Sequence, residues 1–260
     1  MILKITGENG IEKACATGSS QVSLLYSAAY QPGDRITLKL DAPGSFCWVQ
    51  LDDAMPPALV YVKDSVSLQV PFGEGKTSYS PKSFAGDKHL LRAWLTEKDE
   101  LSGPRNLAFN PYDSHENTGF YPHASANVET RGEAVFAARN AIDGVFENSS
   151  HGEWPYESWG INRDPNAALS LDFGREVLVN AVALTLRADF PHDSWWAQAT
   201  VRFSDSSEEI LKLEKTPLPQ RFAIAERTVT GLVLEKLIKA EDDSPFPALT
   251  QIEVFGKEID

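Results

Sequence analysis

The sequence predicts an all-β protein made of two tandem antiparallel β-sandwich domains. Three observations support this fold class, and the first two are short runs in which apolar and polar residues alternate and turns with Gly or Pro between them. A third is that no segment keeps a helical period of apolar residues over several turns. The chain has 260 residues, 42% of them hydrophobic, which is enough to form two cores.

The first half contains five predicted strands separated by turns. Residues 35–40 alternate with a period of two after a Pro-Gly-Asp turn, and residues 46–51 follow a Pro-Gly-Ser turn. The remaining predicted strands of this half are 59–62, 66–70 and 89–95. Regularly spaced short strands of this kind are typical of an antiparallel sandwich.

The composition changes after residue 100. Residues 101–122 are rich in Pro, Gly, Asn, Asp and Ser, as in a segment that connects two domains. We therefore place a domain boundary at residue 106, which gives an N-terminal sandwich of unknown role (1–106) and a C-terminal domain (107–260).

Strands resume in the second half. The alternating or apolar runs are 168–173, 177–187, 199–203, 209–213, 221–224, 229–234 and 251–255. The run 177–187 is long enough for two strand segments. One short helix is expected at 133–141, where Ala is dense.

The charge of the chain excludes some partners. The formal net charge is −13, and residues 111–260 hold 25 of the 37 acidic residues but only 13 of the 24 basic ones. Because a nucleic-acid binder needs a basic surface, nucleic acid is not expected as a partner. Anionic membranes are disfavoured for the same reason, and the acidic half suits a neutral ligand or a cation.

The ends and the cysteines give further expectations. The apolar stretch at Met1–Ile5 is too short for a signal peptide and no run could span a membrane, so we expect a cytoplasmic protein, or an extracellular one if a leader was removed. Cys15 and Cys47 could form one bridge, but we interpret both as small buried apolar residues.

Motifs for catalysis are missing from the sequence. Gly75-Lys76-Thr77 lacks the earlier Gly of a phosphate-binding loop, and there is no His-Glu-x-x-His or Gly-x-Ser-x-Gly. A noncatalytic protein is therefore expected. The enzyme alternative would use His151, Glu153, Asp189, His192 and Asp193 as acid and base groups.

Two segments of the second half concentrate large polar and aromatic residues. Residues 151–160 and 187–196 contain four of the six Trp residues. Aromatic rings can stack on the C–H faces of a sugar, while Arg, His and carboxylates bond its hydroxyls. The predicted ligand-binding residues are His151, Glu153, Trp154, Tyr156, Arg187, Asp189, His192, Asp193, Trp195 and Trp196. Trp159 is expected in the core, and one of Trp195 and Trp196 should be buried because neighbours on a strand face opposite sides.

Several motifs of residues 120–256 resemble a known family. They are Ala124-Ser125-Ala126-Asn127, Asn140-Ala141-Ile142-Asp143-Gly144 followed by Trp159, Leu169-Ser170-Leu171-Asp172-Phe173-Gly174, Val201-Arg202-Phe203-Ser204-Asp205-Ser206 and the closing run 248–256. Their order resembles discoidin-like domains of the coagulation factor 5/8 C-terminal type, which include family 32 carbohydrate-binding modules. The resemblance implies a galactose-binding-like jelly roll.

The resemblance also implies a structural calcium ion. Its ligands here would be the Asn140 carbonyl, the Asp143 carboxylate, Asn148, the Thr250 carbonyl and Gln251, an all-oxygen set. Two positions depart from the family pattern, because Val145 replaces an oxygen donor and Gln251 replaces a Glu. Arg187 matches an Arg that contacts sugar in this family, whereas Gly160 stands where the family often has a His.

Together, these features predict a noncatalytic protein that binds a glycan or small sugar on loops of the C-terminal domain. The alternative is a module that binds a protein partner, and the enzyme described above is less favoured. The fold class alone does not decide among them.

Overall fold

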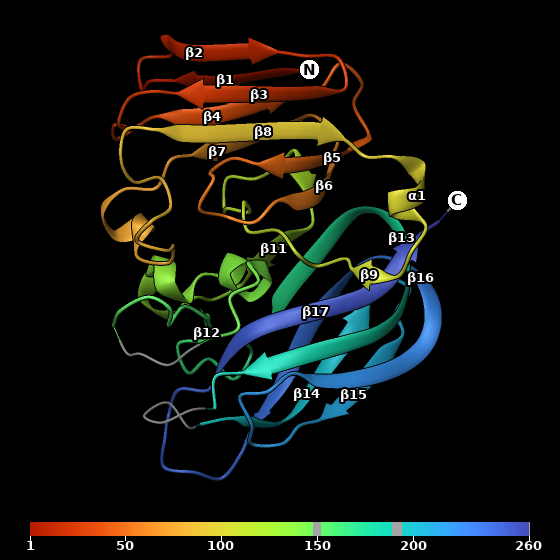
Figure 1. Ribbon diagram of the computed structural model, residues 1–260. Helices are drawn as coiled ribbons and strands as arrows, with labels where there is room; N and C mark the ends of the chain where they lie inside the picture. The colour runs from red at the N-terminus through yellow and green to blue at the C-terminus, as the bar shows by residue number, and fades with distance from the viewer. Residues whose placement is uncertain (148–151, 189–193, 260) are drawn as a thin grey trace.

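The N-terminal part of the chain is a β-sandwich of two antiparallel sheets (Figure 1). The computed structural model describes residues 1–147, 152–188 and 194–259. One sheet has the order β2-β1-β4-β7. The other has the order β10-β6-β5-β8-β3. The strands are β1 (Ile2–Thr6), β2 (Glu12–Thr17), β3 (Gln21–Tyr26), β4 (Arg35–Lys39), β5 (Ser45–Gln50), β6 (Ala58–Val62), β7 (Ser65–Gln69), β8 (His89–Leu95) and β10 (Phe120–Tyr121).

The alternation of these strands creates the first core. In β3, Val22, Leu24 and Tyr26 are buried while the residues between them are exposed. The same pattern in β4 buries Ile36 and Leu38 between the sheets. A 3₁₀ helix, η1 (Gly73–Lys76), and a short helix, α1 (Lys98–Leu101), lie outside the sheets.

The C-terminal part forms one eight-stranded antiparallel sheet that curves around a second core (Figure 1). Its main path is β12-β17-β13-β16-β14-β15, with β11 paired to β13 and β9 paired to β17. The strands are β9 (Arg105–Asn106), β11 (His123–Ala126), β12 (Trp159–Gly160), β13 (Leu169–Leu186), β14 (Trp196–Phe203), β15 (Glu208–Lys212), β16 (Gln220–Lys239) and β17 (Ala248–Glu258). The β13–β16 register is interrupted between Asp172 and Val177, so these long strands bend.

The segment after α1 contributes to both sandwiches. β9 pairs with β17 of the second sandwich, and then β10 pairs with β6 of the first. Leu107 is in the second core and Tyr112 in the first. The chain therefore passes back and forth near the predicted boundary at residue 106.

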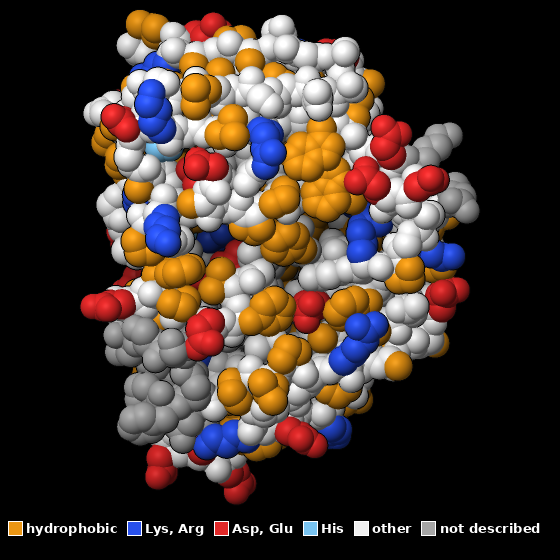
Figure 2. Space-filling view, viewed as in Figure 1, with side chains coloured by type: hydrophobic (Ala, Val, Ile, Leu, Met, Phe, Trp, Pro, Cys, Tyr) orange, Lys and Arg blue, Asp and Glu red, His pale blue; other side chains and the backbone are white. Residues whose placement is uncertain are grey.

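Arg139 links the connecting segment to the second sandwich. It lies in the 3₁₀ helix η4 (Ala138–Ile142) and is 7% exposed. Its guanidinium donates to the carbonyls of Asp113 (3.0 Å) and Pro111 (2.9 Å) and lies 4.4 Å from the Tyr79 ring of the first sandwich. The two sandwiches are in contact, and apolar side chains are visible over both of them on the face in Figure 2.

The structure confirms the all-β, antiparallel prediction. The α-helix expected at 133–141 is wrong. This region holds the 3₁₀ turn η3 (Ala134–Phe136) and most of η4, interrupted by extended Glu133 and Ala137, and another 3₁₀ turn, η2 (Thr130–Gly132), directly precedes it. The predicted run 177–187 forms one strand segment, not two, because residues 177–186 belong to the single strand β13, and β1, β2 and β3 were not predicted.

The cysteines are both free. Cys47 is buried as predicted, but Cys15 is exposed, because β2 is an edge strand that turns this side chain to solvent. Among the described residues, no helix is long and apolar enough to cross a membrane.

Candidate functional site

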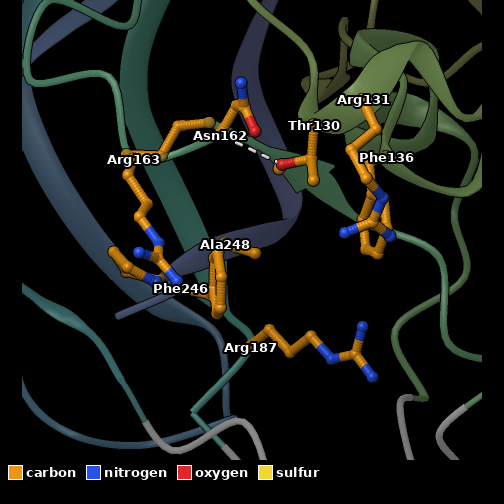
Figure 3. A pocket seen from close by; sticks show the side chains of 11 residues that line it. Thr130, Arg131, Phe136, Asn162, Arg163, Arg187, Phe246 and Ala248 are labelled. Carbon is orange, nitrogen blue, oxygen red and sulfur yellow. Dashed lines mark hydrogen bonds between the residues drawn. The ribbon is translucent and has the colours of Figure 1, made fainter. Parts of the chain in front are cut away.

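A cavity of about 270 Å³ opens where four separate segments of the second sandwich meet. We call it the arginine pocket. It is lined by Thr130, Arg131, Phe136, Gly160, Ile161, Asn162, Arg163, Arg187, Phe246, Pro247 and Ala248. Figure 3 shows Arg163 beside Phe246 on one side of the pocket, Arg131 beside Phe136 on another, and Arg187 on a third.

The turn after β12 presents Arg163 to the pocket. Asn162 and Arg163 both have left-handed backbones, with φ of 48° and 61°. Non-glycine residues rarely adopt this conformation, and it persists when surrounding contacts hold it. One such contact is the hydrogen bond that the Asn162 N–H donates to Thr130 Oγ1, 2.9 Å long. The Arg163 guanidinium lies 4.2 Å from the centre of the Phe246 ring.

Gly160 allows strand β12 to lie close to the 3₁₀ turns that carry Thr130 and Phe136. A Cβ at this position would lie 2.6 Å from Thr130 Oγ1 and 3.1 Å from the Phe136 ring. The space that a side chain would need is therefore already filled by two pocket residues. The His that the family resemblance would lead one to expect at this position therefore has no room here.

Arg187 is buried in the pocket lining, with 2% exposure. It follows β13, and its backbone N–H donates to the Ala248 carbonyl at 3.0 Å. Its guanidinium donates to the Tyr156 carbonyl at 2.7 Å and lies 5.8 Å from the Tyr156 ring. Of the predicted ligand-binding residues, the structure thus brings Arg187 and Tyr156 together.

The pocket lining is cationic although the protein is acidic. The described lining includes three Arg residues and no Asp or Glu. Arg131 pairs with Glu133 through bonds of 2.5 and 2.7 Å, and its hydrogen bond to Glu133 raises the pKa of Arg131. Because a guanidinium only donates hydrogen bonds, this lining favours a ligand that presents acceptor oxygens.

Trp154 lies elsewhere. It lines a smaller cavity of about 80 Å³ together with Pro56 and Tyr79 of the first sandwich and with Arg139 and Asp143. The structure does not place it in the arginine pocket. Glu153 is exposed on the same loop.

Trp195 and Trp196 differ in burial, as the alternation of side chains along a strand predicts. Trp196 is fully buried, and its ring lies 6.3 Å from that of Trp159, which is also in the core. Trp196 therefore contributes to the core and offers no surface to a ligand. Trp195 is half-buried and packs against the edge of the same core. His151, Asp189, His192 and Asp193 lie outside the described residues.

Four of the five predicted calcium ligands converge where η4 meets β17. Gln251 contacts Asn140, Asp143 and Thr250, while Asn148 lies outside the described residues. Burial raises the pKa of the Asp143 carboxyl to about 7, although Arg139 partly offsets the effect.

Sequence reasoning missed most of the pocket lining. Arg131, Phe136, Arg163 and Phe246 come from turns that contain no family motif. One signal was present: Phe246 lies between Pro245 and Pro247, where an aromatic residue is held in a loop rather than in a strand. The other residues are brought together only by the fold.

Comparison with known proteins gives structural likenesses alone. No protein-family model and no curated protein matches the sequence. The chain is similar to chitosan-binding module 1 from a chitosanase/glucanase of Paenibacillus sp. IK-5, with 19% identity, 58% of this chain and 99% of that chain covered, and a TM-score of 0.39. It is similar to the family 32 carbohydrate-binding module of C. perfringens NanJ in complex with galactose (18%, 51% and 91%, 0.39).

A third similar structure is the lectin domain of lectinolysin complexed with Lewis B antigen, with 17% identity, 59% of this chain and 97% of that chain covered, and a TM-score of 0.44. These structures are of the class that the sequence motifs resemble.

Proposed function

We propose that the chain is a noncatalytic carbohydrate-binding protein and that the arginine pocket holds the sugar. The observation that carries this proposal is that two aromatic rings, those of the half-buried Phe136 and the exposed Phe246, line one cavity together with three guanidinium groups.

The chemistry of the lining matches a sugar ring. The apolar C–H face of a pyranose can pack on Phe246, which is 38% exposed. The oxygens around the ring can accept hydrogen bonds from the exposed Arg163, and Asn162 can both donate and accept. A cavity of about 270 Å³ is at the small end of ligand sites, which suits one or two sugar units.

The lining also supports a binding role rather than hydrolysis. Glycosidases use a pair of carboxyl groups on either side of the scissile bond. No Asp, Glu or His is among the described residues that line the arginine pocket. The carboxylate of Glu133 is held by two hydrogen bonds from the lining residue Arg131.

A glycan array followed by titration tests the proposal. We expect at least one glycan to bind with a Kd between about 1 mM and 1 μM, the range of single-site recognition of small ligands. Backbone NMR shifts on adding that glycan should cluster at Gly160–Arg163 and at Phe246–Ala248. The proposal fails if no glycan binds, or if the shifts cluster away from the pocket. Release of a product from the bound glycan or from aryl glycosides would overturn the noncatalytic part.

A further inference from the structure

Four oxygen atoms from two distant segments surround one amide nitrogen of the second sandwich. They are the carbonyl oxygens of Asn140, Val145 and Thr250 and the carboxylate Oδ1 of Asp143. We call them the oxygen cluster. Their distances from Gln251 Nε2 are 2.7, 3.3, 2.7 and 2.8 Å in that order. Three of these atoms, those of Asn140, Asp143 and Thr250, are ones that the family resemblance assigns to calcium, and they lie around the side chain of Gln251, a fourth predicted ligand.

The orientation of the Gln251 amide is determined by its surroundings. Its other end, Oε1, accepts a hydrogen bond of 2.9 Å from the Gly144 N–H. Gly144 can present this N–H because its φ is +83°, and a Cβ there would lie 2.4 Å from the Phe109 ring. A flipped amide would direct its oxygen at four acceptors and its NH₂ group at a donor. Since Gln251 is 2% exposed, solvent cannot compensate for such a flip.

The residues of the oxygen cluster do not fit a calcium ion in this arrangement. Calcium takes six to eight oxygens at about 2.3–2.6 Å, and the space between these four oxygens, where a cation would lie, is occupied by the amide nitrogen. An amide N–H is a donor and offers no lone pair to a metal. Only one carboxylate, Asp143, belongs to the described cluster.

A positive charge already lies next to the oxygen cluster. The Arg139 guanidinium donates to Asn140 Oδ1 at 3.0 Å and acts electrostatically on Asp143. A divalent cation in the oxygen cluster would therefore be repelled by this buried guanidinium, with only Asn140 between the two charges. Both observations disfavour a bound metal here.

We propose that the Gln251 amide takes the place of the structural calcium ion, so that the contact between η4 and β17 is metal-independent. The amide donates to η4 and to its following turn, and Gln251 itself belongs to β17. It therefore joins two segments that are 111 residues apart in the sequence. Ala248, at the start of the same strand, lines the arginine pocket, so this link also helps to hold the pocket lining.

Thermal unfolding of the full chain tests the proposal. We expect the wild-type Tm to be the same, within about 1 °C, in excess EDTA and in excess Ca²⁺. Gln251→Met keeps the length of the side chain and removes the amide, so its Tm should be lower in both solutions and should not respond to Ca²⁺.

Gln251→Glu restores a carboxylate to the oxygen cluster. In EDTA its Tm should be lower than that of the wild type, because two carboxylates then lie close together. Saturating Ca²⁺ should raise it by about 5–10 °C, the shift expected for a ligand near a hundred times its Kd. Gln69→Glu, on an exposed position of β7, is the matched control and should show no response to Ca²⁺.

The wild-type measurement decides the outcome even if Gln251→Glu fails to fold. A wild-type Tm that rises with Ca²⁺ and returns with EDTA, or one calcium ion bound per chain in isothermal titration, would overturn the proposal. So would a Gln251→Met variant whose Tm equals that of the wild type. These readouts do not use sugar binding, so the proposal and the proposed function can fail separately.

Discussion

Replacing Phe246 by Ala should weaken glycan binding without unfolding the protein. Phe246 is 38% exposed and is not part of either core. With about 200 Å² for a whole aromatic side chain, about 75 Å² of apolar surface is open for a sugar face to cover. At about 25 cal/mol per Å² this corresponds to about 2 kcal/mol, or about 30-fold in Kd. A sugar covers only part of the ring, so we expect a loss of about 5- to 30-fold.

The chain offers a matched control for this experiment. Phe72 of the first sandwich is also 38% exposed, and it does not line the arginine pocket. Isothermal titration with the best glycan from an array would compare Phe246→Ala, Phe72→Ala and the wild type. The reasoning is refuted if Phe246→Ala binds within twofold of the wild type, or if Phe72→Ala weakens binding by the same factor.

Three other outcomes follow from the contacts described above. Arg139→Met should lower the free energy of unfolding, measured with urea, by about 3–5 kcal/mol, because it leaves the buried carbonyls of Asp113 and Pro111 without donors. The control Arg202→Met breaks the exposed ion pair with Glu235 and should lower it by less than about 1 kcal/mol. A hydrogen bond to Asp113 raises the pKa of His123 above its unfolded-state value of about 6.5. The protonated His123 therefore stabilises the folded protein fully below about pH 6.5, and this contribution is lost as the pH rises through the folded-state pKa. His123→Asn should therefore flatten the fall in stability between pH 6 and pH 8 measured by urea unfolding; an unchanged slope would contradict this assignment. Gly160→Ala should lower the Tm and weaken glycan binding, because the added Cβ would force Thr130 to move. A variant with the Tm and the glycan Kd of the wild type would contradict this steric argument.

Local patterns were sufficient to predict most of the sheets. Strand β8 coincides with the predicted run 89–95, because its alternation and its flanking turns are both visible in the sequence. The three N-terminal strands were missed although β3 alternates clearly, with Val22, Leu24 and Tyr26 buried. The 3₁₀ turns at 130–142 were also misjudged, since Ala favours a helix but cannot show where extended residues interrupt it.

The candidate site was less accessible to sequence reasoning. Arg187 was predicted from the family motif, and it does line the pocket. Its neighbours Arg131, Arg163 and Phe246 depend on left-handed turns and on pairings between distant segments. Trp154 shows the converse. The composition of its loop suited a sugar site, but the loop places Trp154 beside Pro56 and Tyr79 of the first sandwich. Residue type indicates what a side chain can bind, but the fold decides whether a ligand can reach it.

The contacts between the sandwiches also give the N-terminal part a physical role. Glu74, in η1 of the first sandwich, accepts a hydrogen bond of 2.6 Å from the Ala134 N–H at the start of η3. The same 3₁₀ helix carries Phe136 into the arginine pocket. Because η3 is a single turn between extended residues, it has little intrinsic stability and depends on such outside contacts. The first sandwich thus supports the part of the arginine pocket formed by η3, while Gln251 supports the part formed by the start of β17. The candidate ligand site is therefore a product of the whole chain rather than of the second sandwich alone.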